Sequence, residues 1–286
     1  MLSRRRFLAA TLFVSGYTVL TAVSTAAEKP ERPVKKYVRF QAGETIAYGI
    51  LEGPRIRQLA GDLFGKWEST GKTHALNEVT LLVPGRPGKV LALAGNYKDH
   101  LGEDAELPKT PEPFYKLPSC LLRHEGEVIQ PKSHAPVHYE AELVIVIGKR
   151  AKKVSAAQAL DFVFGITCGN DISARDWQAN DVQWWRAKGT DTFGPCGPYI
   201  VSGLDYNNLN MELRVNGEVR QKTNTKNMIH NIAQTISFIS HHVTLNPGDF
   251  IYTGTPGKTQ PLEIGDVVEV EIEGVGVLRN RLVADE

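Results

Sequence analysis

The stretch that most constrains the fold is HYEAELVIVIGKR, residues 138–150. Its run from Leu143 to Ile147 is apolar at every position, so we expect a strand that is buried on both faces. Glu140 and Glu142 precede this run. Because residues two apart in a strand point to the same face, both carboxylates aim at one volume, about 7 Å apart. Burying them unpaired would be costly, so a shared proton, basic residues or a cation must neutralise them.

A third carboxylate bears on how this pair is interpreted. Alone, Glu140 and Glu142 could equally form a hydrated strand end that needs no partner. In FGITCGNDISARDWQ, however, an apolar strand from Phe164 to Cys168 leads into Asp171 and then into a helix-like segment. Asp171 can project from the strand end into the same volume, or it can cap the helix that follows. The first role favours a buried site with three carboxylates.

Three carboxylates with no His or Cys beside them suit a hard divalent cation, Mg²⁺, Mn²⁺ or Ca²⁺, rather than zinc. Three protein oxygens leave coordination positions open. Such a site can chelate a ligand that offers two adjacent oxygens, for example a 2-oxo acid or the enolate of a β-diketone. The sequence therefore predicts a metal centre that is open to a small oxo acid.

Two further segments offer acid, base and positive charge. In GNYKDHLGED, residues 95–104, His100 and Glu103 are three apart, so on a helical turn the carboxylate can orient the imidazole as a base. Lys188 precedes a stretch rich in Gly and Pro that would hold it on a defined loop. The alternatives are a surface pair for His100 and Glu103 and a solvated lysine for Lys188. Each alternative is favoured for its residue taken alone, and only the occurrence of His100, Glu103 and Lys188 together favours catalysis.

The first 27 residues differ from the rest of the chain. Three arginines, Arg4 to Arg6, precede Phe-Leu and an apolar run. The small residues that follow this run offer a cleavage site near Ala27. This pattern is typical of a signal peptide and resembles the twin-arginine export signal. We expect export to the periplasm with no stable membrane anchor after cleavage; the alternative is an uncleaved anchor.

Beyond the signal, we expect a linker over residues 28–35, a small β-rich domain over 36–86 and a catalytic domain over 87–286. Short strands dominate, so the fold class is a β-rich α+β architecture. We expect helices over residues 97–103, 155–163, 173–181 and 228–243.

Composition excludes some classes of partner. The net charge of +1, from 33 basic and 32 acidic residues, argues against nucleic acid as a partner. Cys120, Cys168 and Cys196 stand far apart without a CxxC spacing. They are expected as reduced, mostly buried thiols, because the twin-arginine route carries folded proteins; one disulfide with a free thiol is the alternative.

Six motifs occur in a characteristic order. They are GNYKDH, YEAELVIVIGK, GNDISARDWQ, AKGTDTFGPCGP, NTKNMI and YTGTPGK. In this order they resemble the fumarylacetoacetate hydrolase family over residues 89–283, with a less specific match to the family's small N-terminal region from Lys36 onward. The resemblance implies a mixed β-sandwich roll, which the small β domain precedes in the sequence. It also implies a homodimer.

The resemblance also implies roles for particular residues. The Mg²⁺, Mn²⁺ or Ca²⁺ ligands fall on Glu140, Glu142 and Asp171, and the family's His/Glu dyad on a mobile lid falls on His100 and Glu103. The family's active-site lysine falls on Lys188 and its substrate-binding glutamine on Gln178. The threonine of its TGTP loop falls on Thr255, and a lysine that some members use on the substrate carboxylate falls on Lys116.

These residues predict a divalent-metal-dependent hydrolase that cleaves a C–C bond in a small 2-oxo or 1,3-dioxo acid through a metal-stabilised enolate, with His100 activating the water. The same enolate chemistry could give decarboxylation, isomerisation, hydration or a ureidoglycolate-lyase-like reaction. Outside enzymes, the alternatives are an exported dicarboxylate-binding protein and a purely structural cation site. The His100 and Glu103 pair favours the enzyme, because a binding protein has no need of it.

Overall fold

The computed structural model describes residues 33–132 and 136–286. The predicted signal peptide lies outside the described residues, as does most of the predicted linker. No helix in the described part of the chain combines the length and the apolar character that crossing a membrane requires. The strands are β1 Lys35–Ala42, β2 Thr45–Glu52, β3 Arg55–Gly61, β4 Trp67–Ala75, β5 Thr80–Leu81, β6 Val90–Ala94, β7 Glu112–Lys116, β8 Leu121–Leu122, β9 Glu127–Gln130, β10 Ala141–Ile147, β11 Val163–Asn170, β12 Gly194–Ser202, β13 Asn210–Val215, β14 Glu218–Asn224, β15 Phe250–Tyr252, β16 Val267–Ile272 and β17 Gly276–Ala284.

Helices are short, apart from one. The α-helices are α1 Lys98–Leu101, α2 Ala156–Ala159, α3 Arg175–Asn180, α4 Trp185–Gly189 and α5 Ile232–His242. Single 3₁₀ turns cover Leu76–Glu78, Pro118–Cys120, Leu160–Phe162 and Thr225–Asn227. The strand-rich α+β class predicted from the sequence is therefore confirmed.

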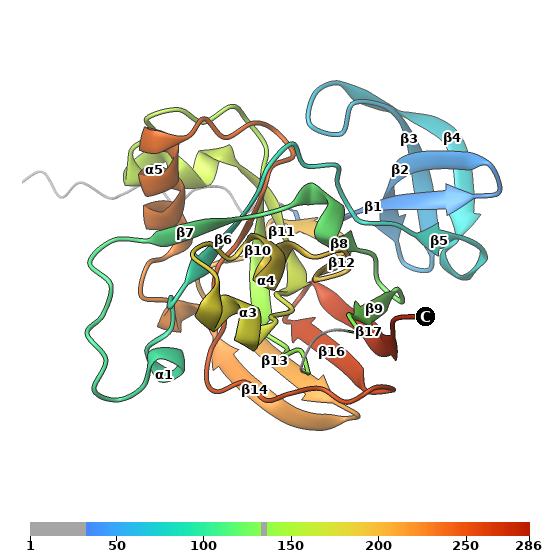
Figure 1. The fold of residues 1–286 in the computed structure, drawn as a ribbon. Coiled ribbons are helices and arrows are strands. Elements are labelled where there is room, and N and C mark those ends of the chain that lie inside the picture. The colour runs from blue at the N-terminus through green and yellow to red at the C-terminus, as the bar shows by residue number, and fades with distance from the viewer. Residues whose placement is uncertain (1–32, 133–135) are drawn as a thin grey trace, which may run out of the picture. The chain divides into compact units, whose positions relative to one another are not determined.

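Two mixed sheets make up the fold (Figure 1). The larger has the order β4-β3-β2-β1-β12-β11-β10-β15-β6-β7, with β5 paired to β1 and β8 paired to β12. Its pairs are antiparallel except β6 with β15 and β8 with β12. The smaller sheet has the order β14-β13-β16-β17-β9, and only β9 with β17 is parallel in it. The N-terminal strands join the larger sheet where β1 pairs with β12.

Strand β10 lies at the centre of the larger sheet and is buried on both faces, as its sequence predicts. Leu143, Ile145 and Ile147 pack into the core shared with the smaller sheet and α5. Val144 and Val146 pack on the opposite side, against residues of β1 to β3 and β15. Because neither face meets water, β10 is a rigid support for whatever its first residues hold.

Helix boundaries differ most from the sequence prediction around the first helix. The segment 97–103 was expected to be one helical turn carrying both His100 and Glu103, but α1 ends at Leu101. Gly102 follows with φ of +107°, which lies outside the helical region and redirects the chain. Strand β7 and helix α4 were not predicted, because EPFYK contains a proline and WRAKG lacks a clear apolar period.

The three cysteines, all within the described residues, are buried and form no disulfide. This agrees with the expectation of reduced, buried thiols.

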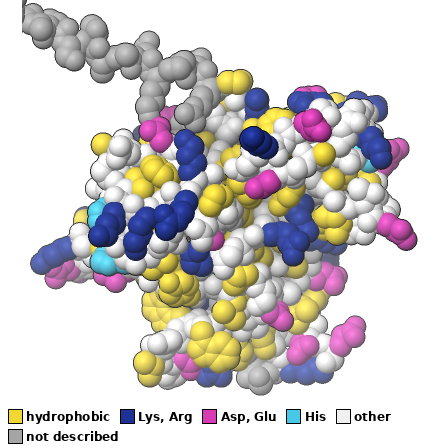
Figure 2. Space-filling model, turned by 90° about the horizontal axis from the view of Figure 1, so that it is seen from above, with side chains coloured by type: hydrophobic (Ala, Val, Ile, Leu, Met, Phe, Trp, Pro, Cys, Tyr) yellow, Lys and Arg dark blue, Asp and Glu magenta, His cyan; other side chains and the backbone are white. Residues whose placement is uncertain are grey.

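Acidic and basic side chains are interspersed with apolar ones on the face shown in Figure 2.

Gly169 in β11 allows the close approach that positions the site strands. A Cβ at this position would lie 2.4 Å from Val144 Cγ2 and 2.6 Å from Tyr252 Cε1, both of them buried side chains. We predict that Gly169→Ala lowers the free energy of unfolding by about 1–3 kcal/mol through overpacking. Urea denaturation measures this. Gly88→Ala, whose Cβ would meet only Asp249 Oδ1 at 3.5 Å, is the control; equal stability of both variants would contradict the packing described.

Candidate metal centre and its cavity

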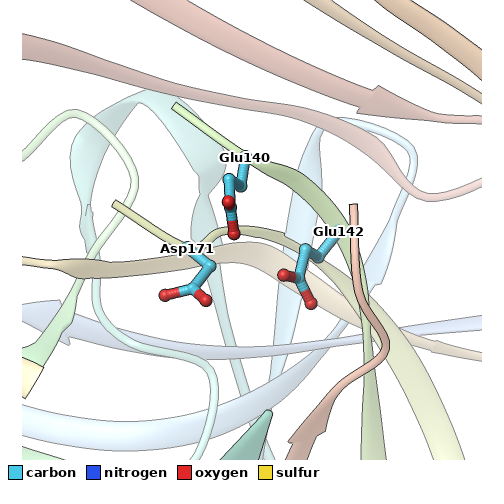
Figure 3. Close-up of side chains that lie close together, drawn as sticks. All are labelled: Glu140, Glu142 and Asp171. Atoms are coloured by element: carbon cyan, nitrogen blue, oxygen red, sulfur yellow. The ribbon is translucent and has the colours of Figure 1, made fainter. Parts of the chain in front are cut away.

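Three carboxylates from two neighbouring strands meet in the interior (Figure 3). Glu140 precedes β10, Glu142 lies within it, and Asp171 follows β11. The antiparallel register pairs Ala141 with Asn170, and the Asp171 backbone N–H donates to the Glu140 carbonyl oxygen at 2.9 Å. One oxygen from each side chain lies within 4.8 Å of the others.

The two alternatives considered for these carboxylates are wrong. Glu140, Glu142 and Asp171 are 4%, 1% and 1% exposed, so they do not form a hydrated strand end. Asp171 does not cap the following helix either, since α3 begins at Arg175 with Ala174 at its N-cap. The side chain of Asp171 points instead to the other two carboxylates.

Three basic side chains surround the carboxylates. Lys188 Nζ donates to Glu140 Oε2 at 2.7 Å and to Asp171 Oδ2 at 2.8 Å. Lys116 Nζ donates to Asp171 Oδ1 at 2.6 Å, and Arg175 Nη2 donates to Glu140 Oε1 at 2.5 Å. Glu140 and Asp171 thus face three positive charges, which reduces the cost of burying either set.

Glu142 is the carboxylate without a basic partner in the described structure. It accepts one hydrogen bond, from the Gly254 backbone N–H to Oε2 at 2.6 Å. Burial raises the pKa of Glu142 well above its usual value, and the charges of Asp171 and Glu140 raise it further. Burial acts in the same direction on Glu140, but Lys188 and Arg175 outweigh it and lower the pKa of Glu140 to about 2. Of the three carboxylates, Glu142 is therefore the one that most readily holds a proton in the metal-free protein.

The donor set fits a hard divalent cation. All three ligand groups are carboxylates, and no His or Cys joins them in the cluster formed by the described residues. The Tyr97 hydroxyl is buried without a hydrogen-bond partner in the same part of the structure. Burial and the charge of Glu142 raise the pKa of Tyr97. An unpaired hydroxyl in the field of Glu142 is consistent with a group that binds there.

A cavity of about 350 Å³ opens beside the carboxylates. Of the predicted site residues, Glu140, Lys188, His100, Gln178 and Thr255 line it. The Gln178 side chain accepts a hydrogen bond from Arg175 Nη1 at 2.7 Å, and the Thr255 hydroxyl accepts one from Gln221 Nε2 at 3.0 Å. The cavity therefore brings together residues from distant parts of the sequence, as the prediction required.

His100 and Glu103 are not brought together in this conformation. His100 Nδ1 lies 2.6 Å from the Gly257 carbonyl oxygen. Because a carbonyl only accepts, Nδ1 carries the hydrogen, which leaves Nε2 as the nitrogen that can act as a base. Glu103 is exposed and borders a separate hollow, together with Lys98 and Lys258. Here Gly257, rather than Glu103, orients the imidazole, because the chain turns at Gly102.

Lys116 requires a correction. The resemblance placed it on the substrate carboxylate, but its ammonium group is fully buried and donates to Asp171, to the Lys188 carbonyl and to the Phe193 carbonyl at 3.2 Å. It is also absent from the cavity lining. All three donor hydrogens are engaged, so Lys116 orients Asp171 and has none left for a substrate.

Several residues of the site had no assigned role in the sequence prediction. Arg175 lies inside the motif GNDISARDWQ, next to predicted residues, so its position in the motif was the available signal. Gln221 gave no such signal. It is the one buried residue of strand β14, and it accepts from the Ala141 backbone N–H and donates to Thr255 and to the Pro256 carbonyl. Phe114 and Trp184 also line the cavity.

Comparison with known proteins agrees with this fold. The family model described as fumarylacetoacetate (FAA) hydrolase C-terminal matches residues 89–283, and a second, described as Rv2993c-like, N-terminal, matches residues 35–84. The chain belongs to the fumarylacetoacetate hydrolase family. Members of this family are enzymes, and they typically use a divalent metal.

Three relatives illustrate the range of the family. Oxaloacetate tautomerase FAHD2A, mitochondrial, of Bos taurus is 42% identical over 72% of this chain and 70% of its own length. The structure of 2-hydroxyhepta-2,4-diene-1,7-dioate isomerase from Mycobacterium marinum has a TM-score of 0.83 and 40% identity, covering 88% of this chain and 99% of that one. Maleylpyruvate hydrolase from Sphingobium sp. SYK-6 has a TM-score of 0.73 and 29% identity, covering 87% and 100%.

We predict that metal binding at a pH below the raised pKa of Glu142 releases about one proton, from the carboxyl group of that residue. The pKa of Glu142 is higher in the folded, metal-free protein than in the unfolded chain, where it is about 4.3. The resulting contribution to stability is fully present below pH about 4.3 and is lost as the pH rises through the pKa of the folded protein. Affinity for Mn²⁺ should therefore fall about tenfold for each pH unit below the pKa of Glu142. Calorimetry in buffers of different ionisation enthalpy counts the proton; a count of zero would contradict the assignment.

Lys116→Met tests the corrected role of Lys116. Removing one partner of a buried ion pair leaves Asp171 undercompensated, so we predict a loss of about 3–5 kcal/mol in the free energy of unfolding. The exposed pair of Lys222 with Glu212 provides the control, since Lys222→Met should cost about 1 kcal/mol or less. A stable Lys116→Met variant with only a raised KM would restore the substrate-binding role.

Proposed function

We propose that the protein is a divalent-metal-dependent enzyme that cleaves a C–C bond in a small 2-oxo or 1,3-dioxo acid by hydrolysis through an enolate. The observation that carries this proposal is the buried triad of Glu140, Glu142 and Asp171, whose member Glu140 lines a cavity together with Lys188 and His100. An open carboxylate-bound cation beside a base and an ammonium group suits a ligand that chelates through two adjacent oxygens.

When bound by the triad, the cation supplies a Lewis acid for the oxygens of the oxo acid, and it is Mg²⁺, Mn²⁺ or Ca²⁺ by its ligands. Lys188 adds a positive charge where the enolate oxygen develops, since its Nζ already lies at 2.7–2.8 Å from two of the carboxylates. His100 lines the cavity and, with Nδ1 held by the Gly257 carbonyl, offers Nε2 as the base that takes a proton from water. Gln178 and Thr255 are placed to hold substrate oxygens.

A second candidate reaction at the same site is tautomerisation or double-bond isomerisation. The separation of His100 from Glu103 favours it, because a single base suffices to move a proton on carbon, whereas hydrolysis also needs a positioned water. Relatives named as an oxaloacetate tautomerase, a dioate isomerase and a maleylpyruvate hydrolase support both reactions. Hydrolysis would require the segment with Glu103 to close on the cavity.

We also propose that the mature protein works in the periplasm as a homodimer with no membrane anchor. The twin-arginine-like motif at Arg4 to Arg6 supports the location, and the family resemblance supports the dimer. The small substrate is its partner; the balanced charge argues against nucleic acid.

The assay uses acylpyruvates and oxaloacetate with Mg²⁺. We predict that Glu142→Gln abolishes the metal-dependent turnover and that His100→Ala lowers kcat/KM by about 10²–10⁴-fold. His241→Ala, on the exposed end of α5, should leave turnover unchanged.

The products distinguish the reactions. Incorporation of ¹⁸O from water into a carboxylic acid product indicates hydrolysis, whereas deuterium uptake at C3 without cleavage indicates tautomerisation. Turnover that survives both Glu142→Gln and His100→Ala would refute the enzyme mechanism. Metal-dependent binding without any turnover would instead support the dicarboxylate-binding protein.

A further inference from the structure

One face of strand β7 runs outward from the metal centre. Residues two apart in a strand share a face, so Lys116, Phe114 and Glu112 follow one another along it in steps of about 7 Å. Their burial decreases in the same order, from buried to half-buried to exposed. Lys116 holds Asp171, and Phe114 and Glu112 line the cavity. The strand therefore presents a cation, an aromatic ring and an anion in sequence from the triad to the cavity mouth.

The middle of this path is apolar. The rings of Phe114 and Trp184 meet edge to face, with centroids 5.2 Å apart, and both line the cavity. Lys188 Nζ lies 5.5 Å from the Phe114 ring centroid, so the apolar wall begins directly beyond the ammonium group. Leu101 and Pro108 also line the cavity. A substrate that reaches past Lys188 meets hydrocarbon here.

The outer end is acidic. Glu112 lines the cavity and has no ionic partner among the described residues. Glu106 lines it too, but its side chain is 86% exposed and has Lys109 at 3.9 Å, so its charge contributes little. The only lining residues of the described cavity that carry or can acquire positive charge are Lys188 and His100, both near the triad end. A carboxylate at the far end of a substrate would meet Glu112 without a compensating cation.

The apolar wall continues beyond the cavity. A neighbouring hollow shares Ala94, Glu112, Phe114 and Trp184 with it and is otherwise lined by residues that include Val182 and Trp185. Val182 and Trp185 are large apolar side chains that are exposed to solvent. Exposed apolar groups beside a cavity are typical of a binding groove, so a tail longer than the first cavity has a surface to lie on.

We propose that the natural substrate is a 2-oxo or 1,3-dioxo acid with a neutral, apolar tail. Phe114 and Trp184 bind that tail, and Glu112 rejects tails that end in a carboxylate. The inference rests on the proposed function and names its substrate class. Four-carbon dicarboxylates are too short to reach Glu112 and are not selected against by it. The relatives named for dioate and maleylpyruvate chemistry act on substrates with a carboxylate at each end, a class of long substrate that the proposal excludes for this chain.

The test is calorimetric binding to the full protein with Mg²⁺. The probes are oxalate, which has no tail, a series of straight-chain 2-oxo acids, and the matched pair 2-oxooctanoate and 2-oxooctanedioate. We expect affinity to rise about fourfold for each added methylene in the neutral series. We expect 2-oxooctanoate to bind about tenfold more tightly than 2-oxooctanedioate, because like charges oppose each other at Glu112.

Variants assign these effects to residues. Glu112→Gln should reduce the preference for the neutral acid to about threefold or less, whereas Glu127→Gln, on an exposed position of β9, should leave it unchanged. Trp184→Ala should flatten the dependence on chain length without changing the affinity for oxalate, which shows that the fold and the metal centre are intact.

Two failures are distinguishable. If oxalate and the short 2-oxo acids show no Mg²⁺-dependent binding, the proposed function itself fails. If they bind but 2-oxooctanedioate binds as tightly as 2-oxooctanoate, or if Glu112→Gln leaves the preference unchanged, the proposed function stands and the assignment of an apolar tail is overturned.

Discussion

The site depends on the compensation of buried carboxylates by three basic side chains. Glu140 and Asp171 each accept hydrogen bonds from two of Lys116, Lys188 and Arg175, whereas Glu142 has only a backbone N–H. This asymmetry makes Glu142 the carboxylate that most readily holds a proton in the folded, metal-free protein. Replacing a proton there with a divalent cation adds one positive charge to the centre, which favours the binding of an anionic oxo acid.

The fold supplies the rigidity that such a centre requires. Strand β10 is packed on both faces, so the backbone that carries Glu142 cannot relax when like charges approach. Its partner β11 delivers Asp171 through the register of an antiparallel pair, and Gly169 lets the two strands and Tyr252 come close. Lys116 and Lys188 come from β7 and α4, which lie elsewhere in the sequence and converge only in the folded chain.

Much of this could be predicted from the sequence, and the exceptions have physical reasons. The apolar run from Leu143 to Ile147 implied a doubly buried strand, and burial then made the adjacent glutamates require neutralisation. The role of Lys116 could not be predicted, because motif position does not reveal whether a lysine points to a cavity or to a carboxylate beneath it. The pairing of His100 with Glu103 assumed a helix that Gly102 ends. Glu112, Phe114 and Trp184 converge through tertiary packing alone.

The central claim is that Glu140, Glu142 and Asp171 together bind one divalent cation. The most direct test is a crystal structure of the Mn²⁺-soaked protein with oxalate, in which anomalous scattering locates the metal. The account predicts one strong peak within about 2.0–2.6 Å of an oxygen from each of the three carboxylates, with oxalate completing the coordination. A peak that involves other residues, or none at the triad while oxalate occupies the cavity, would contradict it.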